Sequence, residues 1–248
     1  MARNYPYKRA IIVGASSGMG EAMARELAAA GAQVALVARR ADELEKIRAS
    51  APDQMRVYAH DVRTFDEVPL LFDRIVGDLG GLDLLVYAAG VMPEVVESEY
   101  AFEKDRAMIE VNVLGAMAWM NPAAARFEAA RAGTIMGVSS IAGERGRRGN
   151  PGYCTSKAAV TTYLESLRNR CSRYGVNVVT IKPGFVDTAM TRGKKGLFWL
   201  ISAPQAAQTS LAVAAGGGSP SRFVPWRWSL VALVVRLLPS FIFRRMNF

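Results

Sequence analysis

The chain has 248 residues, of which 51% are hydrophobic and 21% are charged, so it can bury a large core and is neither disordered nor fibrous. Its formal net charge of +9 is uneven, because residues 188–248 hold eight lysines or arginines and no aspartate or glutamate. Charge gathered in one segment favours a local anionic partner, such as a membrane surface, over a nucleic acid. A solvated basic tail is the alternative interpretation.

The two cysteines, Cys154 and Cys171, fit neither a disulfide framework nor a paired-cysteine metal site. We therefore expect no bound metal and a protein located in the reducing cytoplasm. Peripheral attachment to the inner face of the membrane is the alternative location. The apolar run near the start of the chain covers only residues 10–13, which predicts no signal peptide.

Six short apolar stretches, each bounded by glycine, proline or polar residues, predict buried strands. They lie at residues 9–14, 33–38, 55–60, 83–90, 134–140 and 177–184, and residues 221–226 have a similar pattern. Helical patterns separate them, at residues 19–30, 41–49, 64–79, 100–130 and 151–174. Three of these helices precede a glycine that can form a left-handed cap, namely Gly31, Gly80 and Gly175.

This alternation predicts a single α/β domain with a doubly wound parallel sheet, a Rossmann fold, over residues 1–225. Such sheets bind ligands at the carboxyl ends of their strands, so functional residues are expected in the loops that follow the strands. Residues 226–248 form an apolar and basic extension, which we expect to pack on the domain, on a partner subunit or on a membrane.

A glycine-rich loop follows the first strand directly and leads into a helix. Its residues are Gly14, Ala15, Ser16, Ser17, Gly18, Met19 and Gly20. Glycines permit a tight turn and close approach of the backbone, while the helix N-terminus offers unpaired N–H groups to a pyrophosphate. The loop therefore predicts a dinucleotide cofactor, with the two serines as further hydrogen-bond partners of a phosphate.

The end of the second strand indicates which dinucleotide is bound. An acidic residue there would bind both adenosine ribose hydroxyls and repel a 2′-phosphate, but the sequence has Ala38 followed by Arg39 and Arg40. We therefore expect NADP(H) to be the preferred cofactor, with NAD(H) as the second choice. Two solvated arginines are the alternative interpretation.

Tyr153 and Lys157 lie four residues apart at the start of the last long predicted helix, so their side chains share one face. A nearby ammonium would stabilise the phenolate and lower the tyrosine pKa from its ordinary value of about 10, which suits a proton carrier at neutral pH. Because this spacing is common by chance, its interpretation depends on the other motifs.

The glycine spacing, the tyrosine–lysine pair and a serine thirteen residues before the tyrosine together resemble the short-chain dehydrogenase/reductase family over residues 8–188. The resemblance implies that Ser140 holds the substrate carbonyl, with Ser139 as its structural neighbour. It further implies that Asn112 fixes a water in a proton relay behind Lys157, and that Lys157 binds the nicotinamide ribose.

The same resemblance implies further cofactor contacts. Asp61, beside Val62, would hydrogen-bond the adenine, although a helix cap is the alternative role for its carboxylate. Gly90, after Ala89, would let the backbone pass close to the adenosine ribose. The nicotinamide would lie against Pro183, Gly184, Val186 and Thr188.

Two positions depart from the pattern of the family. Val13 stands where a threonine is usual, and Tyr87-Ala88 replaces a pair of asparagines after the fourth strand. Both changes remove side-chain hydrogen bonds that brace the loops around the cofactor, so they put the affinity for the cofactor in doubt more than the chemistry.

The implied reaction interconverts a carbonyl and a secondary alcohol. Hydride passes between the nicotinamide and the carbonyl carbon, while Tyr153 carries the proton and Ser140 polarises the oxygen. The implied assembly is a homodimer or homotetramer acting on a small molecule. A protein of another class, which binds NADP(H) as a sensor or scaffold without turnover, is disfavoured by the complete set of Ser140, Tyr153 and Lys157.

Three basic segments suggest what else the protein contacts. The segment after Thr188 combines Arg192, Lys194 and Lys195 with apolar residues, which suits a substrate with an apolar body and an anionic group, and a mobile surface loop is the alternative. The apolar tail, interrupted by Arg236 and Pro239, is too short to span a bilayer and suits a membrane interface or a subunit contact. A third basic segment holds Arg145, Arg147 and Arg148, for which a solvated loop is the default expectation and an anionic substrate or headgroup the alternative.

The C-terminal half also resembles, less specifically, the bacterial reductases that act on a polyprenyl-phosphate-linked keto-pentose in cell-wall arabinose synthesis. This likeness rests on the segments GERGRRGNPGY and KPGFVDTAM and on the apolar tail. It implies an alternative function, the reduction of a lipid-phosphate-linked keto-sugar at the membrane surface.

Overall fold

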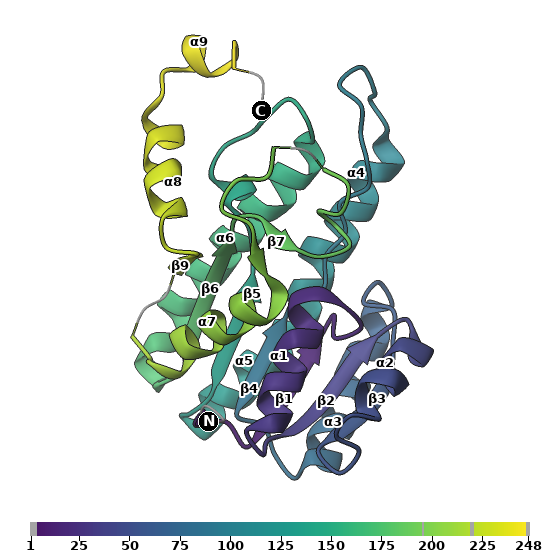
Figure 1. Ribbon diagram of the computed structural model, residues 1–248. Coiled ribbons are helices and arrows are strands. Elements are labelled where there is room, and N and C mark those ends of the chain that lie inside the picture. The colour runs from purple at the N-terminus through teal and green to yellow at the C-terminus, as the bar shows by residue number, and fades with distance from the viewer. Residues whose placement is uncertain (1–3, 195, 219–220, 247–248) are drawn as a thin grey trace.

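The computed structural model describes residues 4–194, 196–218 and 221–246, and within them a parallel sheet of seven strands is covered by helices on both faces (Figure 1). Lys195, one of the predicted substrate-loop cations, and residues 247–248 of the tail lie outside the described residues. The strands follow the order β3-β2-β1-β4-β5-β6-β9. Their bounds are β1 Arg9–Val13, β2 Gln33–Ala38, β3 Met55–Ala59, β4 Leu84–Tyr87, β5 Thr134–Val138, β6 Asn177–Pro183 and β9 Ser221–Val224. The predicted doubly wound parallel sheet is confirmed.

The order of the strands creates the crevice in which a ligand can lie. The sheet grows from β1 toward β2 and β3 on one side and toward β4, β5 and β6 on the other. The loops after β1 and β4 therefore leave the sheet in opposite directions, which opens a cleft at their carboxyl ends. Alternate residues of β1 enter different cores, with Ile11 and Val13 on one face and Ala10 and Ile12 on the other.

Three helices cover each face of the sheet. One face carries α1 Gly18–Ala29, α2 Ala41–Arg48 and α7 Ala203–Ala215, and the other carries α3 Val68–Leu79, α5 Gly115–Ala130 and α6 Pro151–Cys171. The first group buries Met23, Leu44 and Leu211, and the second buries Phe72, Trp119 and Leu164. Both cysteines are buried and free.

Three of the predicted helices need corrected boundaries. The single helix expected over residues 100–130 is instead α4 Phe102–Ile109, a π-helical turn at Glu110–Leu114 and then α5. The helix expected over residues 64–79 begins with a 3₁₀ turn at Phe65–Glu67 before α3, and the helix expected over residues 151–174 is α6 followed by a 3₁₀ turn at Ser172–Tyr174. The glycine caps are as predicted, because Gly31, Gly80 and Gly175 have φ values of 87°, 69° and 75°.

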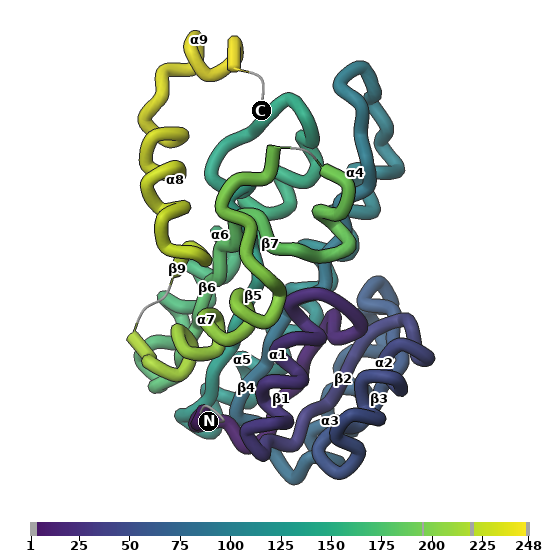
Figure 2. The backbone as a smooth tube through the Cα atoms, viewed as in Figure 1, coloured from purple at the N-terminus to yellow at the C-terminus, as the bar shows by residue number. Residues whose placement is uncertain are grey.

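The segment after β6 extends over the carboxyl edge of the sheet. Strand β7 Val186–Asp187 pairs with β8 Ile201–Ser202, so the described residues between them, 188–194 and 196–200, belong to a loop closed at its base, here called the lid segment. Beyond β9, helices α8 Trp228–Leu237 and α9 Ser240–Phe243 rise along the flank of the molecule and reach past the sheet (Figures 1 and 2). Among the described residues, no helix has the length and apolar character that crossing a bilayer would require.

Candidate active site

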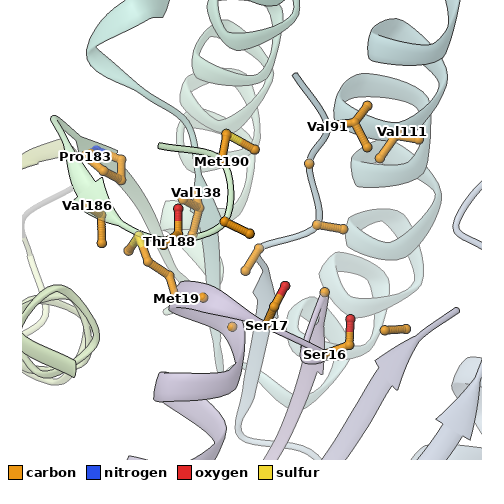
Figure 3. A pocket seen from close by; sticks show the side chains of 18 of the residues that line it. Ser16, Ser17, Met19, Val91, Val111, Val138, Pro183, Val186, Thr188 and Met190 are labelled. Carbon is orange, nitrogen blue, oxygen red and sulfur yellow. The ribbon is translucent and has the colours of Figure 1, made fainter. Parts of the chain in front are cut away.

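A cavity of about 370 Å³ opens at the carboxyl edge of the sheet (Figure 3). Loops after several parallel strands and the first turns of α6 form its wall. The predicted site residues that line it are Gly14, Ser16, Ser17, Gly18, Met19, Gly20, Arg39, Arg40, Val62, Ala89, Gly90, Ser140, Tyr153, Lys157, Pro183, Gly184, Val186 and Thr188. Two predicted residues, Asp61 and Asn112, do not line it.

Sequence reasoning missed ten further residues of the wall. They are Ala38, His60, Ala88, Val91, Val111, Val138, Ser139, Ala189, Met190 and Thr191. All ten lie within three residues of a predicted site residue, so extending each motif by one to three residues would have found them. Val111, which directly precedes Asn112, comes from the π-helical turn, and the other nine come from the strand ends and the loops that follow them.

The glycine-rich loop folds so tightly that side chains are excluded from two positions. Gly14 has a φ of 91°, and a Cβ there would overlap the backbone of Ala89 after β4. A Cβ on Gly20 would overlap the carbonyl of Gly14 across the turn. Space is therefore left for a ligand to approach the backbone at the N-terminus of α1, where N–H groups and the helix dipole favour a phosphate.

The two arginines after β2 take different positions. The Arg40 guanidinium donates to the hydroxyl oxygens of Ser16 and Ser17, with both Nη2–Oγ distances at 2.9 Å. Arg39 stays half exposed, with Nη1 4.0 Å from a carboxylate oxygen of Asp61. The rim of the cavity therefore carries two guanidinium groups and two neighbouring hydroxyls. These are the hydrogen-bond donors that a phosphate monoester needs.

Asp61 does not line the cavity and bonds within its own loop. Its carboxylate accepts a hydrogen bond from the backbone N–H of Arg63 at 3.0 Å and from the Arg63 guanidinium at 2.7 Å. These bonds, the side-chain one first, hold the pKa of Asp61 below its ordinary value. Thr64 is the residue that precedes the next helical turn, and no side-chain hydrogen bond caps that turn, so Asp61 is not a helix cap here. Its contact with the adenine stays a prediction.

Helix α6 begins where it does because of the residues before Tyr153. Asn150 caps the helix through Oδ1, which accepts from the Tyr153 backbone N–H at 3.0 Å, and Pro151 occupies the first helical position. The cap is itself fixed, since Asn150 Nδ2 donates to the carbonyl of Pro93. This start places Tyr153 and, one turn later, Lys157 on the cavity wall with 8% and 5% of their surfaces exposed.

Burial controls the protonation of this pair. It raises the pKa of Tyr153 to about 12, although a hydrogen bond with Ser140 and the charge of Arg147 oppose the rise. Burial also lowers the pKa of Lys157 to about 8. The structure therefore contradicts the expectation that the ammonium lowers the pKa of the tyrosine, since burial outweighs the opposing contacts and Lys157 Nζ lies 5.7 Å from the centre of the phenol ring.

Asn112 braces the loop after β4 from behind the cavity. Its Oδ1 accepts from the Val91 N–H at 2.8 Å, and its Nδ2 donates to the Val91 carbonyl and to Ser156 Oγ. A Cβ on Gly90 would lie 3.4 Å from both Asn112 Oδ1 and Lys157 Nζ, so these two polar atoms converge beneath that glycine. The π-helical turn supplies this position, as such turns often do at functional sites.

Tyr87 provides a brace of its own. Its hydroxyl donates to the Val111 carbonyl in the π-helical turn at 2.5 Å, and the side chain is fully buried. The loss of an asparagine at this position was expected to remove a hydrogen bond that braces the loop. The phenol supplies a hydrogen bond between the end of β4 and the π-helical turn.

The two serines after β5 divide their roles. Ser140 Oγ lies on the cavity wall and accepts from the Ala142 N–H at 3.1 Å. Ser139 Oγ, which is almost fully buried, donates to the Lys157 carbonyl at 2.9 Å and so ties α6 to the end of β5. Ser139 thus fixes the position of α6 and also contributes to the cavity wall.

The basic loop before Tyr153 is not free in solvent, which corrects the default expectation. Arg145 donates to the carbonyls of Val235 and Leu238 and packs over the ring of Phe243, 4.1 Å from its centroid. Arg148 donates to the carbonyl of Met246 and pairs with Glu97 at 3.1 Å. These arginines hold the C-terminal helices, which lie some ninety residues away in the sequence.

A buried ion cluster joins the same parts of the chain. Glu144, in the turn after Ser140, pairs with Lys182 of β6 at 2.8 Å and with Arg236 of α8. The side chains of Glu144 and Lys182 are 1% and 5% exposed, so this pair is shielded from water, whereas the Arg236 side chain is 56% exposed. Removing one member would leave an uncompensated charge in the interior.

An aromatic cluster links the lid segment to the beginning of α8. Trp228 stacks on Phe198 with ring centroids 4.9 Å apart and meets Phe185 and Trp199 edge to face. A Cβ on Gly184 would overlap the Trp228 indole, which shows how closely the C-terminal segment packs against the cavity wall.

Comparisons with known proteins agree with this arrangement. A family model described as short chain dehydrogenase matches residues 8–196. An uncharacterised oxidoreductase of Mycobacterium tuberculosis is 31% identical over 246 residues, covering 96% of both chains, and another of Myxococcus xanthus is 30% identical over 240 residues, covering 96% of this chain and 95% of the relative. A solved structure of ElxO with NADP bound superposes with a TM-score of 0.79 at 22% identity, covering 89% of this chain and 98% of that one.

Proposed function

Because the chain belongs to the short-chain dehydrogenase family of oxidoreductases, we propose that it interconverts a carbonyl and a secondary alcohol with NADP(H) as the cofactor. One observation carries the proposal. Ser140, Tyr153 and Lys157 share one cavity with the glycine-rich loop, so a dinucleotide seated on that loop reaches the three polar side chains. The bound NADP of the superposed ElxO structure supports the same choice of cofactor.

The residues of the cavity fit a dinucleotide. Gly14 and Gly20 leave the space that a phosphate needs at the start of α1, and Arg40 with the two loop serines suits the 2′-phosphate. Lys157 would hold the nicotinamide ribose at the other end. When bound, NADP(H) supplies or accepts the hydride.

The side chains of this protein then handle the oxygen and its proton. During reduction, Tyr153 donates its phenolic proton to the carbonyl oxygen, and Ser140 Oγ donates a hydrogen bond to the same oxygen. The Lys157 ammonium stabilises the phenolate that remains. Asn112 lies behind Lys157, where it would hold a water through which the proton is replaced, and oxidation runs the steps in reverse.

The test is the oxidation of NADPH in the presence of a panel of carbonyl compounds. A sensor or scaffold would bind NADPH but reduce no carbonyl compound of the panel. Its wild type and a Tyr153 variant would then behave alike. Reduction of at least one carbonyl that depends on Tyr153 supports the enzyme. Binding without turnover across the panel, by a protein that also lacks alcohol oxidation with NADP, would favour the scaffold.

The choice of cofactor gives a separate prediction. Arg40→Ala is expected to raise the Kd for NADPH about 10- to 100-fold, because a charge-assisted hydrogen bond to the 2′-phosphate is lost. The Kd for NADH should rise much less, since NADH has no such phosphate. Arg48→Ala, an exposed arginine on α2, is the matched control and should change neither value. Fluorescence titration measures both affinities, and equal losses for the two cofactors would contradict the assignment.

The lid segment supports a substrate with an apolar body and an anionic group. Arg192 and Lys194 are exposed on it, beside Phe198 and Trp199. Reduction of a lipid-phosphate-linked keto-sugar is one reaction of this kind and stays a prediction from the sequence, as does a homodimer or homotetramer. We keep residues 1–225 as the reductase domain and residues 226–248 as its extension.

A further inference from the structure

Helix α8 exposes an apolar stripe that no described residue covers. Leu230, Leu233, Val234 and Leu237 have 54%, 56%, 58% and 73% of their surfaces exposed. Their spacing of three, one and three residues places them on one face of the helix. Phe241 of α9 is 57% exposed and extends the apolar surface. Contiguous apolar surface of this kind on a helix normally contacts something else.

The opposite face of α8 is fixed to the domain. Trp228 and Ala232 are 3% and 2% exposed, one turn apart. Arg145 holds the carbonyls of Val235 and Leu238 at the end of the helix, and Glu144 pairs with Arg236. These contacts fix the orientation of the helix. The stripe is therefore exposed because α8 is held in place, and its exposure is not caused by a loose chain end.

The surroundings of the stripe are cationic. Arg222, Arg227, Arg244 and Arg245 are exposed around it, and the sequence has no acidic residue from 188 to 248. The acidic groups that approach this segment from elsewhere are already paired, Glu144 with Lys182 and Arg236, and Glu97 with Arg148. An apolar stripe flanked only by cations is therefore left open.

The apolar stripe and the arginines around it together indicate which surface covers the stripe, a second copy of the chain or an anionic bilayer. A second copy of the chain packed through the same face would bring arginines against arginines with no acidic partner in the segment, which is unfavourable. The surface of an anionic bilayer offers both an apolar interior and phosphate groups, and arginine binds phosphate with two hydrogen bonds. Trp226, which is 72% exposed, suits the level of the headgroups.

We propose that α8 and α9 dock this protein on the surface of an anionic lipid bilayer, with the stripe of Leu230, Leu233, Val234, Leu237 and Phe241 buried at the acyl boundary. Helix α8 would lie in the plane of the interface, which suits its ten residues. The lid segment and the C-terminal helices occupy the same end of the molecule (Figures 1 and 2). Docking through α8 would therefore place the flank that carries this helix against the lipid, whatever carbonyl the enzyme reduces.

The test is flotation of the full-length protein with vesicles of phosphatidylcholine alone or mixed with phosphatidylglycerol. Wild type is expected to float with the anionic vesicles and to be released at high salt. Leu233→Asn with Leu237→Asn should weaken binding about 100-fold or more, and Arg244→Gln with Arg245→Gln about 30-fold. Leu70→Asn, which changes a leucine 79% exposed on α3, and Arg126→Gln on α5 are the matched controls and should bind as wild type does.

Three results would overturn the proposal. The first is wild type that stays unbound with both kinds of vesicle while it folds and binds NADPH. The second is equal binding by the Leu233/Leu237 variant and the Leu70 variant. The third is a wild-type oligomer that ignores vesicles and dissociates in the Leu233/Leu237 variant, because the stripe would then be a contact between copies of the chain. Far-UV circular dichroism and NADPH affinity of each variant verify folding independently of the vesicles.

Discussion

Tyr153→Phe is expected to lower kcat/KM for carbonyl reduction about 10²- to 10⁴-fold, the usual contribution of a positioned general acid. The substitution removes one oxygen from a side chain that is 8% exposed and whose backbone N–H is fixed by Asn150. The ring therefore keeps its place, and the Kd for NADPH should change little. Burial raises the pKa of Tyr153 to about 12, so the phenol is protonated at neutral pH and can donate its proton.

A second tyrosine on the same helix provides the control. Tyr163 lies outside the cavity, and its hydroxyl donates to Asn121 Oδ1 at 2.6 Å on the outer face of α6. Tyr163→Phe makes the same chemical change at a distance from the proposed chemistry and should leave kcat/KM within a factor of about two. If the two variants were equally active, the proton would have to come from another group, and the assignment of Tyr153 would be lost.

The arrangement of the sheet and the clustering of the site could be predicted because both follow from local patterns. Each parallel strand is a short apolar run, and each run ends at glycine or a polar residue. Parallel strands bring all of these ends to one edge, so Gly14, Gly90, Ser140 and Gly184 meet without any long-range contact being known in advance. The caps at Gly31 and Gly80 are equally local, since a left-handed residue there needs no Cβ.

The sequence could not predict features that depend on contacts between distant segments. The π-helical turn at Glu110–Leu114 lies inside the continuous helix that the pattern of residues 100–130 predicts, and it is tied to β4 by the Tyr87 hydroxyl. The sequence predicts Arg145 to be a solvated loop residue, because the carbonyls that it binds at the end of α8 lie about ninety positions later in the chain. Burial is a further feature that depends on distant segments. It raises the pKa of Tyr153, whereas the nearby lysine charge alone predicted a lower pKa.

Lys157 carries an energetic cost that its pKa makes measurable. Burial lowers the pKa of this ammonium from 10.5 to about 8, so its charged form is penalised in the folded protein. Below pH 8 the penalty is fully present. Between pH 8 and 10.5 the unfolded chain binds more protons at this residue than the folded protein does, and the stability contributed through Lys157 therefore rises with pH. Above 10.5 both states are neutral there, and the penalty is gone.

Lys157→Met keeps the length of the side chain and removes the charge, so it is expected to make the protein more stable and inactive. The gain in free energy of unfolding should reach about 3 kcal/mol at pH 7 and shrink as the pH rises from 8 toward 10.5. Urea unfolding of both proteins at several pH values measures the difference, in which the titration of Tyr153 largely cancels. Lys8→Met, at an exposed position, should give a small difference that does not vary with pH. A gain that stays constant across this range, or a variant that is less stable at pH 7, would contradict a buried ammonium. A Lys157→Met variant that is more stable and no longer reduces carbonyls would show that the Lys157 charge destabilises the fold and is needed for the reaction.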